Sequence, residues 1–183
     1  MVIKSVIRKK FLKKRKKKYF DLDSNFFNPL LDIIFKKKIN NFKLGIYFPT
    51  AYELNVLAIF RNRRFSKFKF FFPVINDKDQ IEFHNWSNQE ILFVNKYGIL
   101  EPEKKREITP NFILVPLLAF DKNKYRLGYG KGYYDRYLNK INKKKRNIVT
   151  IGVAFSFQRH HKLPVNENDY KLDYILTEEG IIK

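Results

Sequence analysis

The chain has 183 residues, a length that fits one domain over residues 1–183 with a sizeable buried core. It contains no cysteine, which excludes disulfides, thiolate metal sites and cysteine nucleophiles, and which favours a reducing, cytoplasmic setting. No apolar run approaches the roughly 20 residues of a membrane helix, and the N-terminus lacks the apolar core of a signal peptide. We therefore expect neither membrane insertion nor secretion.

The formal net charge is +20, and residues 1–20 hold ten Lys or Arg and no acid. Such a segment is typical of a nucleic-acid-binding arm or a membrane-surface helix. The alternative is compositional drift, because Lys, Asn, Ile, Phe and Tyr are enriched together, as in a strongly AT-rich genome. We favour the drift and expect no nucleic-acid partner, although a basic surface still attracts anionic ligands such as nucleotides.

Two helices are expected before the first strand. Residues 2–14 place apolar side chains on one face at a helical period: Val2, Ile3, Val6, Ile7 and Phe11. Residues 28–38 begin with Asn28 as the N-cap and Pro29 at the first helical position. That second helix ends on Lys36–Lys38, which suit the negative end of the helix dipole.

The rest of the chain alternates between strand and helix patterns. Helices are expected at 50–62, where Thr50 and Glu53 have capping-box spacing, as a short segment at 87–94, and at 133–146. Strands are expected at 43–48, 67–75, 111–120, 147–155 and 172–177. This alternation predicts an α/β fold, a mainly parallel sheet with helices on both faces in a three-layer, Rossmann-like arrangement. Residues 75–111 lack this alternation of strand and helix patterns and are expected to form a loop-rich insertion.

The segment "FDKNKYRLGYGKGYYDRYL" (120–138) follows the most apolar strand and contains three alternating glycines at 128, 130 and 132. Glycines without Cβ atoms can turn their amides towards a phosphate and let it approach closely. The helix that follows adds positive potential at its N-terminus. Arg126 and Lys131 bring full charges for a polyphosphate, and Asp135 in the first helical turn can hold Mg²⁺ against it.

The spacing is not that of a known nucleotide fingerprint. Tyr133 breaks G-x-G-x-x-G, and G-x-x-x-x-G-K-[ST] does not occur in the chain. A glycine-rich turn with Asp135 as a helix-dipole partner is the plain structural alternative.

The segment "LVPLLAFDKNKYRLGYGKGYYDRYL" resembles the signature of the 5-formyltetrahydrofolate cyclo-ligases, also called 5,10-methenyltetrahydrofolate synthetases. The similarity extends to "KSVIR", "IYFPTAYE", "YGILEP", "GVAFSFQ" and "LPVNENDYKLDYILTEEG". This resemblance implies an enzyme that spends ATP, with Mg²⁺, to cyclise 5-formyltetrahydrofolate to 5,10-methenyltetrahydrofolate, releasing ADP and phosphate. The steps that the resemblance implies are phosphorylation of the formyl oxygen, attack of the neighbouring amine on the activated carbon, and departure of phosphate.

The resemblance also implies site residues. The ATP contacts are Lys4, Arg8, Arg126, Leu127, Gly128, Tyr129, Gly130, Lys131, Gly132, Tyr133 and Tyr134. The folate contacts are Phe48 and Glu53, together with Tyr129, Gly130, Lys131, Gly132 and Tyr133. Arg126 and Lys131 are the expected catalytic cations, and Asp135 and Asp169 the expected magnesium ligands.

Alternatives remain open at this point. The capping box with Thr50 explains Glu53 without any ligand, and Asp173 is expected to be structural. The chain as a whole could be an ATP- or phosphometabolite-binding α/β protein of the same fold without cyclo-ligase activity. We expect the protein to be a monomer.

Overall fold

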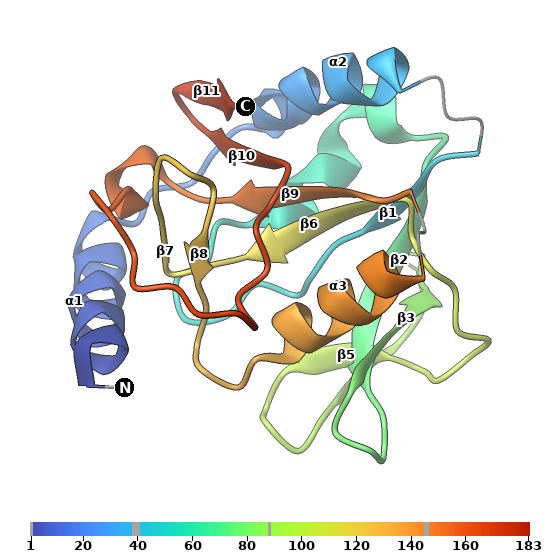
Figure 1. Cartoon of the computed structure of the whole chain (residues 1–183). Helices are drawn as coiled ribbons and strands as arrows, with labels where there is room; N and C mark the ends of the chain where they lie inside the picture. The colour runs from blue at the N-terminus through green and yellow to red at the C-terminus, as the bar shows by residue number, and fades with distance from the viewer. Residues whose placement is uncertain (1, 38–40, 88, 145–146) are drawn as a thin grey trace.

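The computed structural model describes residues 2–37, 41–87, 89–144 and 147–183 (Figure 1). Its centre is a seven-stranded sheet in the order β11-β10-β9-β6-β1-β2-β3. The strands are β1 (Lys43–Gly45), β2 (Lys69–Ile75), β3 (Ile81–Asn85), β6 (Phe112–Pro116), β9 (Val149–Val153), β10 (Tyr174–Thr177) and β11 (Gly180–Ile182). All neighbours from β10 to β2 pair in parallel, and the two edge strands, β3 and β11, pair antiparallel. The predicted mainly parallel sheet is confirmed.

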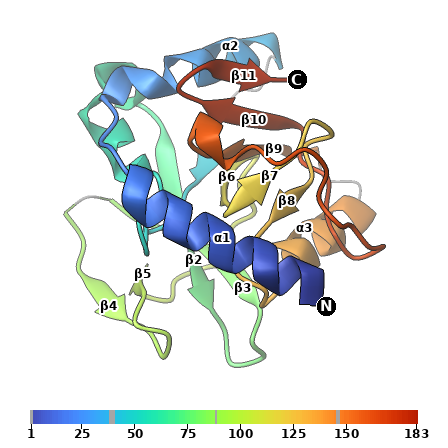
Figure 2. The same ribbon diagram turned by 90° about the vertical axis from the view of Figure 1, so that its left-hand side faces the viewer.

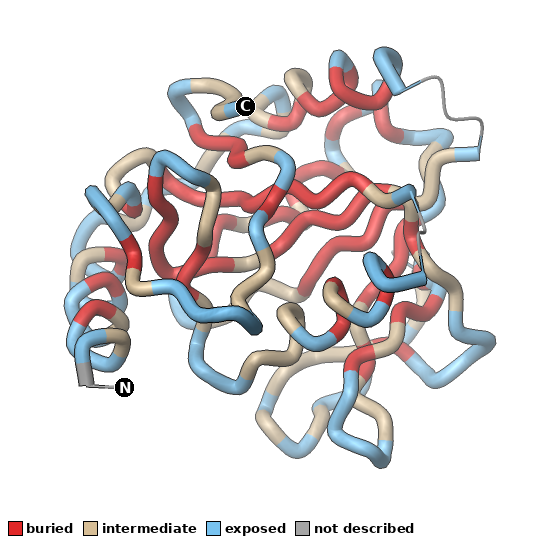
Figure 3. Tube along the Cα trace, viewed as in Figure 1, coloured by how far each residue is buried: buried red, intermediate tan, exposed pale blue. Residues whose placement is uncertain are grey.

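Helices cover both faces of this sheet. On β6, Phe112 and Leu114 belong to one apolar cluster, while Ile113 and Val115 belong to another. The first cluster receives α2 (Asn28–Lys36) and the 3₁₀ helices η2 (Val56–Arg61) and η3 (Arg63–Phe65), and the second receives α3 (Tyr133–Lys143). Strands buried on both faces explain the continuous apolar runs in the sequence, and Figure 3 shows the burial concentrated in the central strands. The three-layer prediction is confirmed.

The N-terminal helix α1 (Val2–Lys18) lies across the end of the sheet and not on a face (Figure 2). Its buried side chains are Ile7, Phe11 and Arg15, one helical turn apart, and the two apolar ones pack on Leu118, Ala119, Leu127 and Leu163. The predicted face is therefore partly wrong. Ile3 and Val6 are 67% and 59% exposed, because this contact is only one residue wide on the helix. The side chain of Val2 lies outside the described part of the structure.

Two expected helix starts are also wrong. The helix α2 continues directly from the 3₁₀ helix η1 (Ser24–Phe27), so Asn28 lies inside helical structure and is not its N-cap. Asp23 caps η1 instead, where its carboxylate accepts from the amide of Asn25 at 2.7 Å. Lys38, where the sequence predicts the end of this helix, lies outside the described residues.

No α-helix begins at Thr50. Ala51 and Tyr52 have φ values of 45° and 62°, in the left-handed region that interrupts a right-handed helix. The helical structure starts later, as η2, where the Asn55 side chain accepts from the amide of Leu57 at 3.1 Å. Glu53 nevertheless reaches back to Thr50, as a capping box requires.

The insertion at 75–111 is more ordered than predicted. β3 extends the main sheet by a hairpin from β2, and β4 (Leu92–Val94) pairs with β5 (Leu100–Pro102) in a second hairpin. The helix expected at 87–94 is wrong, because β4 occupies its second half; residue 88 lies outside the described residues.

The apolar segment 111–120 is not one strand. β6 ends at Pro116, and the chain then turns into β7 (Ala119–Phe120), which pairs with β8 (Arg126–Leu127) immediately before the glycine loop. The end of the helix expected at 133–146 falls on residues 145–146, which also lie outside the described residues.

Candidate active site

A cavity of about 1470 Å³ opens beyond the carboxyl ends of β1, β2 and β6. It is larger than the roughly 300–1,000 Å³ typical of a site for one small ligand, so it has room for two. All the predicted site residues line it: Lys4, Arg8, Phe48, Glu53, Arg126, Leu127, Gly128, Tyr129, Gly130, Lys131, Gly132, Tyr133, Tyr134, Asp135 and Asp169. Residues up to 165 positions apart in sequence thus meet at the edge where parallel α/β sheets bind ligands.

The glycine loop leaves β8 and enters α3 along one wall of this cavity. Gly130 and Gly132 have φ values of 104° and 67°, whereas Gly128 does not adopt a left-handed conformation. Gly132 is the N-cap of α3, so the first turn of that helix begins at the cavity. Gly130 and Gly132 therefore adopt backbone conformations that favour glycine, and the N-terminus of α3 lies beside them. That their amides turn towards a phosphate stays a prediction.

The helix α1 brings two cations to the cavity, next to the glycine loop. Lys4 and Arg8 are one turn apart and face the same side. Arg8 Nε donates to the carbonyl oxygen of Gly128 at 2.8 Å, and Lys4 Nζ forms an ion pair with Asp169 Oδ2 at 2.5 Å. The basic N-terminus is therefore joined to the glycine loop by specific contacts.

Of the two expected metal ligands, Asp135 contacts the segment that carries Asp169. Asp135 Oδ1 accepts from the amide of Tyr170, the residue after Asp169, at 3.1 Å. The same oxygen pairs with Arg126 Nη2 at 2.9 Å, and the buried position of Arg126 lowers the pKa of its guanidinium. Among the described residues no group of three or more His, Cys, Asp or Glu gathers as a metal cage.

Glu53 is a nearly buried carboxylate in the cavity wall. It accepts from the amide of Thr50 at 2.7 Å and from its hydroxyl at 3.2 Å. Burial raises the pKa of Glu53, and the Thr50 amide and the charge of Arg15 partly oppose that rise. Nearby, the buried hydroxyl of Tyr134 has no hydrogen-bond partner within the described chain. One acidic group among aromatic side chains suits a flat heterocycle that carries an amine.

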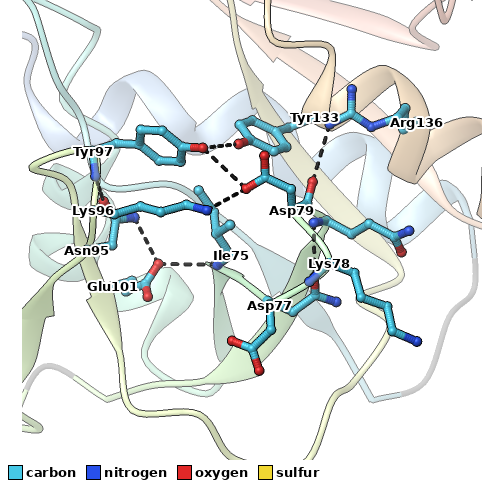
Figure 4. A network of polar contacts seen from close by, with 12 residues as sticks. Ile75, Asp77, Lys78, Asp79, Asn95, Lys96, Tyr97, Glu101, Tyr133 and Arg136 are labelled. Atoms are coloured by element: carbon cyan, nitrogen blue, oxygen red, sulfur yellow. Dashed lines mark hydrogen bonds and ion pairs between the residues drawn. The ribbon is translucent and has the colours of Figure 1, made fainter.

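The insertion lines a further side of the cavity. Figure 4 shows its polar contacts with Tyr133 and Arg136. Tyr97 in the β4–β5 turn shares a 2.7 Å hydrogen bond between hydroxyls with Tyr133 and donates to Asp79 Oδ1 at 3.2 Å. Lys131 Nζ lies 3.3 Å from the centre of the Tyr97 ring, a cation–π contact. Arg136 on α3 donates to the carbonyl of Asp79 at 3.3 Å. Both hairpins of the insertion are thus tied to the glycine loop and α3.

Sequence reasoning assigned no role to several lining residues. The "YGILEP" segment carried a signal, since it was part of the resemblance, and it supplies Tyr97, Ile99 and Leu100. The basic side chains of α3 gave no separate signal in so basic a chain. The lining has eight Lys or Arg against three acids, the basic ones being Lys4, Arg8, Arg126, Lys131, Arg136, Lys140, Lys143 and Lys144. This excess favours an anionic ligand.

Comparison with known proteins identifies one family. The model of the 5-formyltetrahydrofolate cyclo-ligase family matches residues 2–178. The chain is 32% identical over 186 residues to the 5-formyltetrahydrofolate cyclo-ligase of Mycoplasma genitalium, covering 96% of this chain and 98% of that protein.

Solved structures agree as well. The 5,10-methenyltetrahydrofolate synthetase of Aquifex aeolicus is similar with a TM-score of 0.76 and 30% identity, covering 99% of this chain and 92% of that one. The synthetase of Mycoplasma pneumoniae gives a TM-score of 0.67 and 26% identity, covering 94% and 97%. The chain therefore belongs to the 5-formyltetrahydrofolate cyclo-ligase family.

Proposed function

We propose that this chain cyclises 5-formyltetrahydrofolate to 5,10-methenyltetrahydrofolate, with ATP converted to ADP and phosphate. The observation that carries the proposal is one cavity lined by a glycine loop, two aspartates and a buried glutamate. The relatives' names support this activity over a binding protein of the same fold without catalysis.

The glycine loop is the proposed triphosphate site. The amides at Gly130 and Gly132, the first turn of α3, and the cations Lys4 and Arg8 all border the same space. Such groups stabilise phosphate oxygens whose charge changes during transfer. Arg126 and Lys131 are the proposed catalytic cations. Arg126 also fixes Asp135 by its ion pair.

Asp135 and Asp169 are the proposed Mg²⁺ ligands, and their chemistry fits. Mg²⁺ is usually held by one or two carboxylates and completes its octahedron with phosphates and water. When bound, the ion would neutralise charge on the transferring phosphoryl group. Because each carboxylate is already paired with a cation, Arg126 or Lys4, we expect weak affinity for the free ion and entry as the ATP complex.

Phe48 and Glu53 are the proposed folate contacts, with the segment 129–133 on the other side. Glu53 can accept a hydrogen bond from the amine of the pterin ring. Amide oxygen is a poor leaving group, so transfer of a phosphoryl group to the formyl oxygen activates the formyl carbon. The neighbouring amine then forms the new C–N bond, and the C–O bond breaks as phosphate leaves. No covalent enzyme nucleophile is needed, and the chain contributes positioning and charge.

The test is the absorbance of methenyltetrahydrofolate formed from 5-formyltetrahydrofolate by the purified protein. We expect product only with ATP and magnesium together, and one ADP for each product. A non-hydrolysable ATP analogue is the matched control and should give none. Folded protein that binds ATP but forms no product would instead favour the non-enzymatic alternative.

Three further expectations remain predictions: one cyclo-ligase domain over residues 1–183, a cytoplasmic enzyme, and a monomer. Light scattering tests the monomer. No helix in the described part of the chain has the length and apolar character to cross a membrane.

A further inference from the structure

Arg15 is a buried cation that the proposed chemistry does not use. It lies on α1 two turns beyond Ile7, only 1% exposed, and does not line the cavity. Within the described chain it forms no ion pair with an acid, and its Nε has no hydrogen-bond partner. Burying a guanidinium without a paired acid is unfavourable unless neighbouring groups require its position.

Its remaining nitrogens join three separate segments. Nη2 donates to the carbonyl of Ala51 at 2.6 Å and to the hydroxyl of Tyr129, and Nη1 donates to the carbonyl of Leu117 at 3.3 Å. Tyr129 belongs to the glycine loop, and Leu117 follows β6. One side chain therefore connects α1, the turn before Glu53 and the loop that faces Glu53.

The turn that Arg15 holds is strained. Ala51 and Tyr52 are consecutive non-glycine residues with positive φ, at 45° and 62°. L-residues occupy this region at a cost, and such strain persists where the surroundings over-determine it, often at binding sites. The turn returns the chain so that the carboxylate of Glu53 reaches Thr50 and lines the cavity.

We propose that Arg15 is a positioning residue for the folate half of the cavity: its guanidinium fixes the 50–53 turn that presents Glu53 and locks that turn to Tyr129 of the glycine loop. The inference rests on the proposed function, because it takes Glu53 as a folate contact. A free carbonyl at Ala51 and a free Tyr129 hydroxyl would otherwise let the two walls move independently.

The charge of Arg15 has a second consequence for Glu53. The groups that face this carboxylate are Thr50, Arg15 and three tyrosines, Tyr47, Tyr129 and Tyr134. Burial raises the pKa of Glu53, and Arg15 is the cation that opposes the rise. If Arg15 loses its charge, the pKa of Glu53 rises further. Less carboxylate is then ionised at a given acidic pH, and the acidic limb of folate kcat/KM moves to higher pH.

The experiment compares Arg15→Met, Arg15→Lys and the neighbouring Lys14→Met in the full-length protein. Lys14 donates to the carbonyl of Phe157 at 2.6 Å, away from the cavity, and serves as the control. The measured quantities are KM for folate, KM for ATP, and the pH dependence of folate kcat/KM at saturating ATP. Melting temperature shows which variants are folded at the assay temperature.

We expect Arg15→Met to raise KM for folate roughly tenfold or more, the size of one charge-assisted hydrogen bond, with a smaller change in KM for ATP. Its acidic limb should move to higher pH. Arg15→Lys keeps the positive charge but lacks the planar guanidinium. In this variant the acidic limb of folate kcat/KM should lie near its position in the unaltered protein, while KM for folate stays raised. Lys14→Met should match the unaltered protein in all three.

A folded Arg15→Met protein with unchanged folate KM and pH profile would overturn the inference. If Arg15→Met does not fold, the result for Arg15→Lys decides. A raised KM for folate with an unchanged acidic limb of the kcat/KM profile supports the inference, and a normal KM for folate overturns it. An unaltered protein without turnover would overturn the proposed function and this inference together. If the unaltered protein turns over normally and the Arg15 variants keep its folate KM and pH profile, the inference alone is overturned.

Discussion

Replacing Asp135 with Asn separates the metal role of this residue from its structural role. On sequence alone, a helix-dipole partner would contribute about 0.3–1 kcal/mol of stability. The structure adds Arg126, whose side chain is 3% exposed and lies 2.9 Å from Asp135 Oδ1. Removing one partner of a fully buried ion pair costs about 3–5 kcal/mol. Because the Asp135 side chain is 26% exposed and Asn keeps one acceptor oxygen, we reduce this to about 1–3 kcal/mol.

For a chain of this length, each kcal/mol lowers the melting temperature by about 2–4 °C, so Asp135→Asn should lower it by roughly 2–12 °C. Loss of a metal ligand at the transferring phosphoryl group should reduce the rate roughly a hundredfold or more, and excess magnesium should partly restore it. The expected loss of stability is therefore measurable, but it is too small to explain the expected loss of turnover rate. Turnover and melting temperature across a magnesium titration measure both.

Two matched variants sharpen this test. Asp169→Asn breaks the partly buried Lys4 pair, where we expect a stability loss of roughly 1–2 kcal/mol with the same magnesium-dependent rate loss. Asp173→Asn weakens two structural hydrogen bonds, from the amide and the hydroxyl of Thr150 at 2.8 and 2.7 Å, and should lower stability without a magnesium effect. Near-normal rates for Asp135→Asn at limiting magnesium, or an equal rate loss in Asp173→Asn, would refute the metal assignment.

Three other substitutions test the remaining walls. Glu53→Gln should raise KM for folate about tenfold or more. Because burial raises the pKa of Glu53, the stability that this residue contributes is present at low pH and is lost as pH rises through that pKa. The Gln variant should therefore have a higher melting temperature than the unaltered protein at pH 8 but not at pH 4. Gly130→Ala places a Cβ 3.2 Å from the Arg8 guanidinium at φ 104° and should weaken ATP use, whereas Gly98→Ala has a similar positive φ in open space and should leave kinetics unchanged. Arg8→Met should raise KM for ATP about tenfold, with exposed Lys9→Met as the control; an equal effect of both would point to general charge and not to the Gly128 contact.

The layered fold, the family and the enzyme class could be predicted because their signals are local and repeated. Apolar runs such as 112–116 have no polar alternation, which indicates a strand buried on both faces. The glycine loop and Asp135 lie within ten residues of each other, so one segment carried the site's main signal. These predictions are confirmed by the sheet order and by the family match.

What failed depended on tertiary context. The segment from Thr50 to Asn62 begins with the capping-box spacing of an α-helix. Ala51 and Tyr52 nevertheless have left-handed φ values, and Arg15, 36 residues away from Ala51, holds this turn. Likewise, Ile3 and Val6 fit an amphipathic period, but only Ile7 and Phe11 of α1 join the apolar cluster at the end of the sheet. Propensity and periodicity do not report such long-range contacts. The individual roles of the site residues remain predictions.

Three buried charged side chains lie in or next to the cavity wall. Arg15, Glu53 and Arg126 are all at least 93% buried, although each alone is unfavourable away from water. Each of them fixes a segment that the apolar core does not hold. Arg15 and Glu53 fix the 50–53 turn. Arg126 fixes the start of α3 through its ion pair with Asp135. A core-like replacement such as Arg15→Met would pack well and still release the turn. We therefore expect stability and turnover to separate at these three positions, and a set of variants in which both fell strictly together would argue that the buried charges serve folding alone.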